Sequence, residues 1–183
     1  GFYEPRFQDV VKRKVQVSAQ PAPPAAAYSA RPVELELDPN RFNIGYFGNF
    51  YANRGLGDYV HALEAIPEVD RPSLHVFSSA DASTGIDVSG VHLHSPLKYL
   101  EFLNALTQFD ALLVVDTDTS GTSYAKNPFL PSKYSDYKGS GVPVWAMVEA
   151  GSPLDGEGLD FASTLGSAEE AQSVLRRLLG LQR

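Results

Sequence analysis

From Asn40 onward, apolar segments of strand length alternate with segments whose apolar residues recur at helical spacing. This alternation constrains the fold more than any other feature of the sequence. Ala111–Val115 is apolar on both faces, which is typical of a central strand in a parallel sheet. The predicted strands are 42–47, 73–77, 91–94, 111–115 and 142–148.

Helices are predicted between these strands at 55–66, 132–139 and 168–179. A further helix is expected where Leu97, Leu100, Leu103 and Leu106 recur, with these leucines on one face. Strands that alternate with helices predict an α/β fold, a Rossmann-like doubly wound parallel sheet. In such a sheet, ligands bind beyond the carboxyl ends of the strands.

The first 40 residues differ from the rest of the chain. Residues 21–27 form a Pro/Ala tract that is not expected to form a helix or a central strand and is typical of a semi-rigid spacer. We therefore predict that residues 1–40 are the end of a preceding domain with its linker, and that 41–183 form the ligand-binding domain. A simple tail is the alternative. Because Gly1 stands where Met would, we expect the sequence to be a piece of a longer protein.

Composition excludes several classes of protein. The formal net charge of −7 argues against a general nucleic-acid binder. The absence of cysteine excludes disulfides, thiolate metal sites and cysteine nucleophiles, and it fits a cytoplasmic location. No apolar run approaches the ~20 residues of a membrane-spanning helix. The sequence contains no Gly-x-Ser-x-Gly motif, so it gives little support to hydrolase chemistry.

Two predicted loops lead into helices at the ligand edge of the sheet. Residues 48–55 contain glycines and end with Arg54 before a helix, so backbone N–H groups and a guanidinium could hold an anion there. In the second loop Ser132 is the expected N-cap of a helix that carries Lys133 and Asp136 in its first turns. A lysine at a helix start can hold a diphosphate, and Asp136 can accept hydrogen bonds from sugar hydroxyls. An ordinary turn and an ordinary capped helix are the alternatives.

Other residues carry weaker signals. Asp116 and Asp118 follow the strand 111–115, and two such carboxylates could hold a divalent metal on a nucleotide diphosphate. Asp110 precedes that strand and should lie at the opposite end. The histidines are expected to have packing or surface roles, and only His94, near a strand end, is a candidate for ligand contact. The four histidines are His61, His75, His92 and His94.

Three segments together resemble a known family. They are 42–59, 109–115 and 127–143, and the last reads Asn-Pro-Phe-Leu-Pro-Ser-Lys-Tyr-Ser-Asp-Tyr-Lys-Gly-Ser-Gly-Val-Pro. They are similar to the donor-binding, C-terminal half of GT-B fold glycosyltransferases. The likeness is greatest to the bacterial retaining group whose second domain carries Pro-x-Lys-x-x-Glu/Asp-Tyr-x-x-x-Gly-x-Pro. It spans about residues 42–154.

The resemblance implies a role for each matching residue. Gly48, Arg54, Ser132 and Lys133 would face the donor diphosphate, and Asp136 would bind the ribose hydroxyls. Two positions differ from the family pattern, because Asn49 stands where many relatives have Arg and the family's first acid is missing near Pro128. Asn127 or backbone groups would then serve the sugar hydroxyls. The residues implied in base binding are Phe77, Ser78, His94 and Leu97.

The implied activity is glycosyl transfer from a nucleoside diphosphate sugar to an unknown acceptor, with no tightly bound metal or other cofactor. The implied partner is an N-terminal acceptor-binding domain, through which such enzymes can contact a membrane peripherally. Two alternatives remain from the residues themselves. One is a metal-dependent GT-A-like transferase that uses Asp116 and Asp118, and the other is a non-catalytic Rossmann-like binding or regulatory module.

Overall fold

The computed structural model describes residues 20–49, 56–79 and 89–181, and every structural statement below refers to these residues. They contain one six-stranded sheet with the order β3-β2-β1-β4-β5-β6, and every neighbouring pair is parallel. The order reverses between β1 and β4, which makes their carboxyl ends the topological switch point. The strands are β1 (Asn43–Phe47), β2 (Ser73–Phe77), β3 (Val91–His94), β4 (Ala111–Val115), β5 (Val144–Val148) and β6 (Phe161–Thr164).

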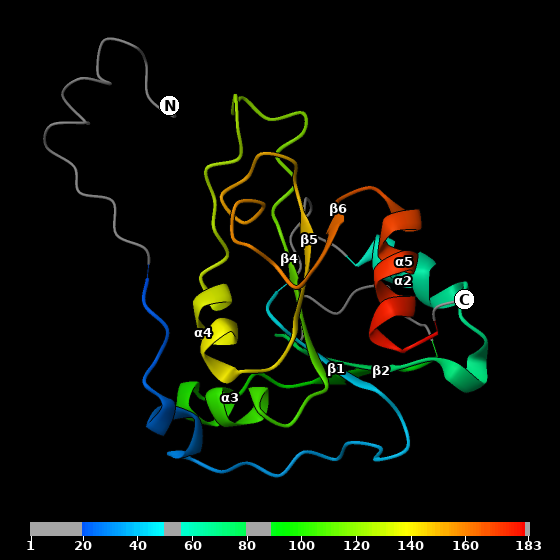
Figure 1. Ribbon diagram of the computed structural model, residues 1–183. Helices are drawn as coiled ribbons and strands as arrows, with labels where there is room; N and C mark the ends of the chain where they lie inside the picture. Colours follow the sequence, from blue (N-terminus) through cyan, green and yellow to red (C-terminus); the bar gives the residue numbers. More distant parts are fainter. Residues whose placement is uncertain (1–19, 50–55, 80–88, 182–183) are drawn as a thin grey trace, which may run out of the picture.

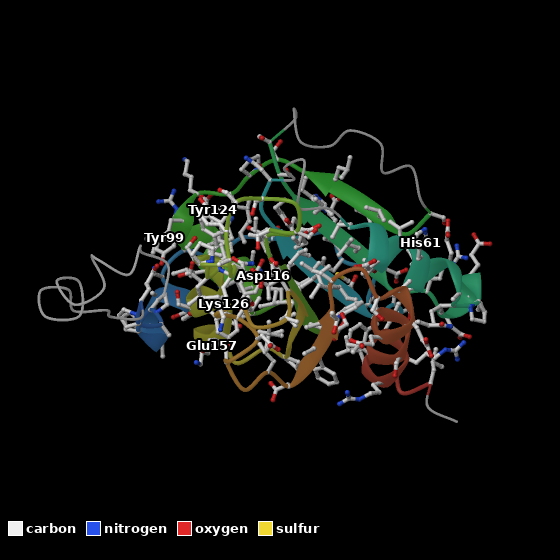
Figure 2. All side chains as sticks on the ribbon, turned by 90° about the horizontal axis from the view of Figure 1, so that it is seen from above. His61, Tyr99, Asp116, Tyr124, Lys126 and Glu157 are labelled. Carbon is white, nitrogen blue, oxygen red and sulfur yellow. The ribbon has the colours of Figure 1, made fainter. Side chains whose placement is uncertain are left out.

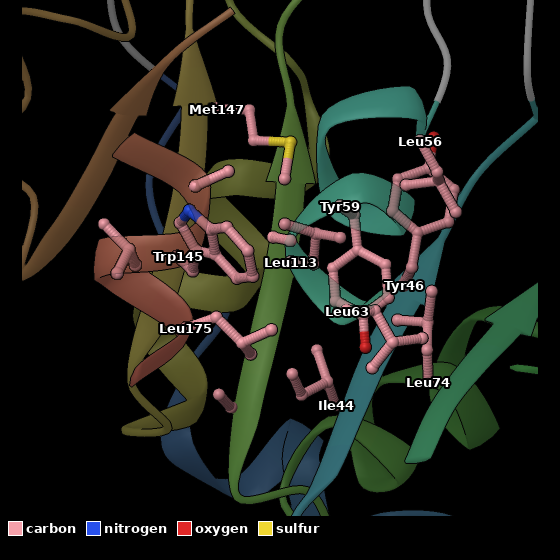
Figure 3. Close-up of a cluster of buried hydrophobic side chains, with 14 of the residues drawn as sticks. Ile44, Tyr46, Leu56, Tyr59, Leu63, Leu74, Leu113, Trp145, Met147 and Leu175 are labelled. Atoms are coloured by element: carbon pink, nitrogen blue, oxygen red, sulfur yellow. The ribbon is translucent and has the colours of Figure 1, made fainter. Parts of the chain in front are cut away.

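Helices cover both faces of the sheet (Figure 1), with α2 and α5 on one side and α3 and α4 on the other. The first core, shown in Figure 3, packs Tyr59 of α2 and Leu175 of α5 against Leu113 and Trp145 of the sheet. The second core joins α3 and α4 to the opposite face. The helices are α2 (Gly57–Glu64), α3 (Tyr99–Leu106), α4 (Lys133–Ser140) and α5 (Ala168–Leu178), with short 3-10 turns η1 (Ala25–Ser29) and η2 (Glu68–Asp70).

The structure confirms the predicted α/β class and the five predicted strands, and it adds an edge strand that the sequence analysis missed. That strand, β6, is short and only partly buried, so it lacks a continuous apolar signal. The predicted helix 55–66 corresponds to α2, Gly57–Glu64. Residue 55, the first of the predicted range, lies outside the described residues. Helices 132–139 and 168–179 are confirmed within one residue at each end as α4 and α5.

The predicted leucine face of the third helix is wrong. Leu97 precedes α3 and Leu100 is 42% exposed, whereas Leu103 and Leu106 are fully buried. Residues three apart rotate by about 60° away from a common face at each step, because an α-helix has 3.6 residues per turn. The buried face instead combines Leu103 and Leu106 with Phe102 and Ala105.

Two local expectations are also corrected. Ser132 precedes α4, but its backbone is already helical and its side chain makes no capping hydrogen bond among the described residues. The Pro/Ala tract was expected to contain no helix, yet its last residues begin η1, where the Ala27 amide donates to the Pro24 carbonyl at 2.8 Å. Pro24 stands just before the turn, where its missing N–H removes no helical hydrogen bond.

The segment that contains η1 is fastened to α3 and α4. Tyr28 is buried, and its hydroxyl donates to the Asp136 carbonyl of α4 at 2.6 Å. From α3, the Asn104 side-chain amide donates to the Tyr28 carbonyl at 2.8 Å and accepts from the Val33 amide at 3.0 Å. Whether residues 1–40 end a preceding domain stays a prediction, but residues 20–37 pack on the sheet domain itself.

Gly139 lies on α4 at a point where this segment packs tightly against the helix. A Cβ at position 139 would overlap the Tyr28 hydroxyl and would lie 3.0 Å from the Ala22 Cβ. Glycine inside a helix costs about 1 kcal/mol relative to alanine. The helix therefore carries an unfavourable residue where the linker needs the space.

We predict that Gly139→Ala destabilises the protein, although helix propensity alone would favour it. The new methyl group must displace Tyr28, which costs more than the ~1 kcal/mol that alanine gains in a helix. Gly57→Ala is the matched control, since a Cβ there meets nothing within 4 Å. Chemical denaturation should give a lower free energy of unfolding for Gly139→Ala and an equal or higher one for Gly57→Ala. A stabilised Gly139→Ala protein would contradict this packing.

Candidate functional site

A pocket of about 410 Å³ lies at the topological switch point, and we call it the switch-point lobe. The ends of β1 and β4 form its floor, and the first residues of α4 form one wall. This is where an open parallel sheet places its ligand. Its lining residues are Tyr46, Phe47, Gly48, Asn49, Phe77, Ser79, Pro96, Leu113, Val114, Val115, Pro131, Ser132, Lys133 and Tyr137.

A second pocket of about 390 Å³ adjoins the first, and we call it the aromatic lobe. The two share five lining residues, so they lie side by side, and we treat them as the two lobes of one candidate site. The aromatic lobe adds residues from α3 and the first turn of α4, together with Gln20 from the start of the described chain. Its lining residues are Gln20, Phe47, Phe77, Pro96, Leu97, Tyr99, Phe102, Ser132, Lys133 and Asp136.

Tyr137 holds α4 against the end of β1. Its hydroxyl accepts from the Phe47 amide at 3.1 Å, and the ring is almost fully buried. Pairing between β1 and β4 ends at Tyr46, so Tyr137 supplies the partner that the next amide would otherwise lack. Burial raises the pKa of the Tyr137 hydroxyl, which therefore stays neutral. The start of α4 is thereby held at the rim of the switch-point lobe.

Lys133 lies where the two lobes meet, and its ammonium group stands 5.3 Å from the centre of the Phe102 ring. Burial lowers the pKa of Lys133, while the nearby Asp136 carboxylate acts in the opposite direction. The partly desolvated ammonium and the positive end of the helix dipole together favour an anionic ligand.

Asp136 lies one turn further along α4 and lines the aromatic lobe. Its Oδ1 atom accepts a hydrogen bond from the Tyr99 hydroxyl at 2.9 Å. Burial raises the pKa of the Asp136 carboxyl, and the Tyr99 hydrogen bond and the Lys133 charge counteract this shift. The carboxylate is thus positioned to accept hydrogen bonds in a lobe that has four aromatic residues among its ten lining residues.

Asn49 fixes the loops at the other side of the switch-point lobe. Its Oδ1 atom accepts from the Ser78 hydroxyl, the Ser79 amide and the Ser79 hydroxyl, each at 3.1 Å. These contacts join the end of β1 to the end of β2. Asn49 therefore lines the lobe and also fixes the positions of Ser78 and Ser79 beside it.

An aromatic stack forms the wall between the pocket and the edge of the sheet. The Phe47 and Phe77 rings stack at 4.5 Å, and His94 stacks on Phe77 at 4.6 Å. Behind them, the buried His75 ring lies 3.0 Å (Nδ1 to Nε2) from His94 and 3.3 Å (Nε2 to Oδ1) from Asn43. The exposed His92 ring also stacks on His75 at 4.9 Å.

The loop that follows β4 is organised by two carboxylates. Asp116 is fully buried and accepts from the Thr117 and Glu149 amides at 3.0 and 3.3 Å. Glu149 accepts from the Thr119 amide at 2.9 Å and from the Asn127 side chain at 2.9 Å. Within the described ranges, no group of three or more His, Asp or Glu side chains is placed to hold a metal ion.

The structure brings together seven of the eleven candidate site residues. Gly48 and Asn49 line the switch-point lobe, Leu97 and Asp136 line the aromatic lobe, and both lobes contain Phe77, Ser132 and Lys133. The remaining four are Ser78, His94, Asn127 and Arg54.

Three of these residues line neither lobe, and the fourth, Arg54, is not among the described residues. Ser78 and His94 stand behind the lining, in contact with Asn49 and Phe77. Asn127 is buried, donates to the Thr117 carbonyl at 2.8 Å, and supports the loop. Arg54 lies outside the described residues, so its predicted contact with a diphosphate stays a prediction.

The remaining predictions from the sequence divide clearly. Asp110 accepts from the Asn43 amide at 2.7 Å, at the amino end of β1, as expected. His61 is exposed on α2, and Figure 2 shows it well separated from Tyr99 and Asp116. Four further residues of the site were not predicted from the sequence, namely Phe47, Tyr99, Phe102 and Tyr137. Phe47 directly precedes Gly48, and Tyr99 follows Leu97 by two residues, so closeness in sequence to predicted site residues was the signal that could have indicated these two.

Two solved structures are similar to this chain. One is WaaG, a glycosyltransferase involved in lipopolysaccharide biosynthesis, with a TM-score of 0.57 and 17% identity over 78% of this chain and 39% of WaaG. The other is sucrose-phosphate synthase from Thermosynechococcus elongatus, with a TM-score of 0.58 and 17% identity over 96% of this chain and 47% of the synthase. This chain spans less than half the length of either protein.

At this level of identity the likeness shows the fold, and it confirms the predicted Rossmann-like sheet, matching the domains of GT-B glycosyltransferases. No protein-family model matches the chain, and no curated protein sequence matches it. Among the described residues, no helix has the length and apolar character needed to cross a membrane.

We predict that the His75 cluster makes the protein less stable in acid. Burial, followed by the neighbouring His92 and His94 rings, lowers the pKa of His75 from 6.5 to about 4, and burial also lowers that of His94, an effect that Glu36 opposes. Between these two pH values the unfolded chain binds a proton that folded His75 does not. The free energy of unfolding should therefore fall as the pH decreases through this window and be fully retained above it.

Urea denaturation at a series of pH values checks this prediction. His75→Phe should show a smaller loss of stability between pH 6.5 and pH 4 than the wild-type protein. The control is His61→Gln, which removes an exposed histidine from α2. An identical pH dependence in the wild type and in His75→Phe would show that His75 does not cause the acid sensitivity.

Proposed function

We propose that this chain binds the nucleoside diphosphate sugar donor of a glycosyltransferase and forms its C-terminal, donor-binding domain. One observation carries the proposal. Lys133 and the start of α4 face a pocket at the switch point of the sheet, and Asp136, one turn further on, faces an adjoining aromatic lobe. A diphosphate needs a positively charged pocket such as the one at Lys133. A ribose with its base needs a carboxylate beside an aromatic lobe, as Asp136 provides.

The two lobes suggest how the donor is oriented. The diphosphate would lie in the switch-point lobe, where Lys133 and the backbone N–H groups of the helix start oppose its charge. The ribose hydroxyls would donate to Asp136, and the base would lie among the apolar and aromatic side chains of the second lobe. Its volume of about 390 Å³ falls within the usual range of small-molecule sites.

The proposed chemistry is the breaking of the bond between the sugar's anomeric carbon and the diphosphate oxygen. Negative charge develops on the departing diphosphate, and a positioned ammonium and N–H groups stabilise that charge in the transition state. The acceptor, whose nucleophilic atom forms the new bond to the anomeric carbon as the diphosphate leaves, would bind to an N-terminal acceptor-binding domain. Membership of the bacterial retaining group, the absence of a required cofactor, peripheral membrane contact through that domain and a cytoplasmic location stay predictions.

Two alternatives predict different ligand behaviour. A non-catalytic binding or regulatory module need not bind nucleoside diphosphates. A metal-dependent transferase would use Asp116 and Asp118, although Asp116 is buried and already accepts two backbone amides. Of the three proposed functions, donor binding best explains why Lys133 and Asp136 line adjoining lobes.

Calorimetric titration with UDP, GDP, ADP and inorganic pyrophosphate tests the proposal. At least one nucleoside diphosphate should bind. Lys133→Ala should weaken that ligand and pyrophosphate alike, by about 10- to 100-fold, because a hydrogen bond to a charged group contributes ~1.5–3 kcal/mol. Asp136→Asn should weaken only the ligand that carries a ribose. Arg54→Ala should behave as Lys133→Ala does if Arg54 contacts the diphosphate.

Lys138→Ala is the matched control. Lys138 is exposed on the same helix and pairs with Glu157 at 3.0 Å, away from both lobes. Its loss should leave the affinities unchanged. The absence of binding by any nucleoside diphosphate would favour the non-catalytic module. Binding that disappears when EDTA removes divalent metal would favour the metal-dependent transferase.

A further inference from the structure

The linker that precedes the sheet domain reaches the aromatic lobe. Gln20 lines that lobe beside Tyr99 and Asp136. From there the chain continues through η1, which packs against both α3 and α4, and these two helices supply four of the lobe's ten lining residues. In Figure 1 the dark blue segment lies beneath these helices before the chain crosses to β1. A segment expected to act only as a spacer is thus part of the wall around the pocket.

Asp136 is held by two tyrosines from different parts of the chain. Tyr99 of α3 donates to its carboxylate at 2.9 Å, and Tyr28 of η1 donates to its main-chain carbonyl at 2.6 Å. Tyr99 is more than half exposed, whereas Tyr28 is 6% exposed. Burial raises the pKa of Tyr28 to about 12, so its hydroxyl remains a hydrogen-bond donor at neutral pH. The backbone position of Asp136 therefore depends on the linker.

Further contacts keep Tyr28 in place. Asn104 of α3 bonds to the Tyr28 carbonyl and to the Val33 amide, and Gln108 donates to the Val33 carbonyl at 2.8 Å. On the side of α4, Gly139 leaves the space that the Tyr28 hydroxyl needs. The linker is thus bonded on both sides of Tyr28, and a shift of residues 20–33 would move the hydroxyl that contacts Asp136.

We propose that residues 20–33 are a functional part of the nucleotide site, with Tyr28 as the positioning residue for Asp136. The inference rests on the proposed function, because it assumes that Asp136 holds a ribose. Docking of the linker sets the position of the carboxylate, and ribose binding in turn stabilises the docked linker. This reciprocity follows from thermodynamic linkage between the two events.

Tyr28→Phe tests the proposal, because it removes one hydroxyl and keeps the ring. The nucleoside diphosphate that the wild-type protein binds should bind about fivefold more weakly to the variant, the size expected for one hydrogen bond of ~1 kcal/mol. Inorganic pyrophosphate contains no ribose, so its affinity should not change. This difference between the two ligands separates a positioning role from a general loss of structure.

Tyr134→Phe is the matched control. Tyr134 lies on α4, is also 6% exposed, and donates to the Glu157 carbonyl at 3.3 Å, outside both lobes. Tyr134→Phe loses a comparable hydrogen bond, but one that lies outside the lobes. The affinities for the nucleoside diphosphate and for pyrophosphate should therefore stay at the wild-type values. Amide hydrogen exchange supplies a second readout. The Ala27 and Val33 amides, which bond to Pro24 and Asn104, should exchange more slowly in wild-type protein when the nucleoside diphosphate is bound.

The outcomes are distinguishable. If the wild-type protein binds no nucleoside diphosphate, the proposed function fails and this inference fails with it. If the wild type binds one and Tyr28→Phe binds it equally well, only the inference is overturned. An equal loss of pyrophosphate affinity in Tyr28→Phe, or unchanged exchange at Ala27 and Val33 on nucleotide binding, also overturns the inference.

Discussion

The hydrogen bond between the Phe47 amide and the Tyr137 hydroxyl, 3.1 Å long, fixes the geometry on which the site depends. Phe47 is the last residue of β1, and Tyr137 lies in the middle of α4. The bond is buried, and an unpaired amide at this position would cost about 1–3 kcal/mol. Because β1 and α4 cannot separate without that cost, the start of α4 stays at the carboxyl ends of β1 and β4.

This constraint determines which side chains meet. With α4 held in place, Lys133 lies between the lobes and Asp136 turns toward α3, where Tyr99 bonds to it. The opposite wall is equally defined, since Phe47 and Phe77 stack and Asn49 joins the ends of β1 and β2. The site is therefore preorganised by buried contacts that lie behind its lining residues.

Some of this arrangement could be predicted from the sequence, because strands and helices have different periods and parallel sheets bind ligands at one edge. The apolar segment 111–115 and the positions of Lys133 and Asp136 after a strand were enough to place the fold and the core of the site. The same reasoning could not find Tyr28, whose contact with Asp136 spans 108 residues. Asn127 looked equally suitable as a ligand contact, yet it bonds to Thr117 and Glu149.

Long-range contacts of this kind depend on how helices dock, which local patterns do not encode. Gly139 illustrates the limit, since in the sequence it is only an unfavourable residue in a predicted helix. The structure gives the reason for glycine at this position, because a Cβ there would overlap the Tyr28 hydroxyl. The Pro/Ala tract shows the same limit. Its proline content indicates a locally stiff segment, but it carries no information on what that segment packs against.

If the proposed function is right, a nucleoside diphosphate occupies the two lobes at the switch point. Amide chemical-shift mapping of the ¹⁵N-labelled protein shows where such a ligand binds. The largest changes should fall on Gly48, Ser132, Lys133 and Asp136. Changes confined to the separate 280 Å³ pocket near Gly141 and Gly158, or no changes with any nucleoside diphosphate, would contradict it.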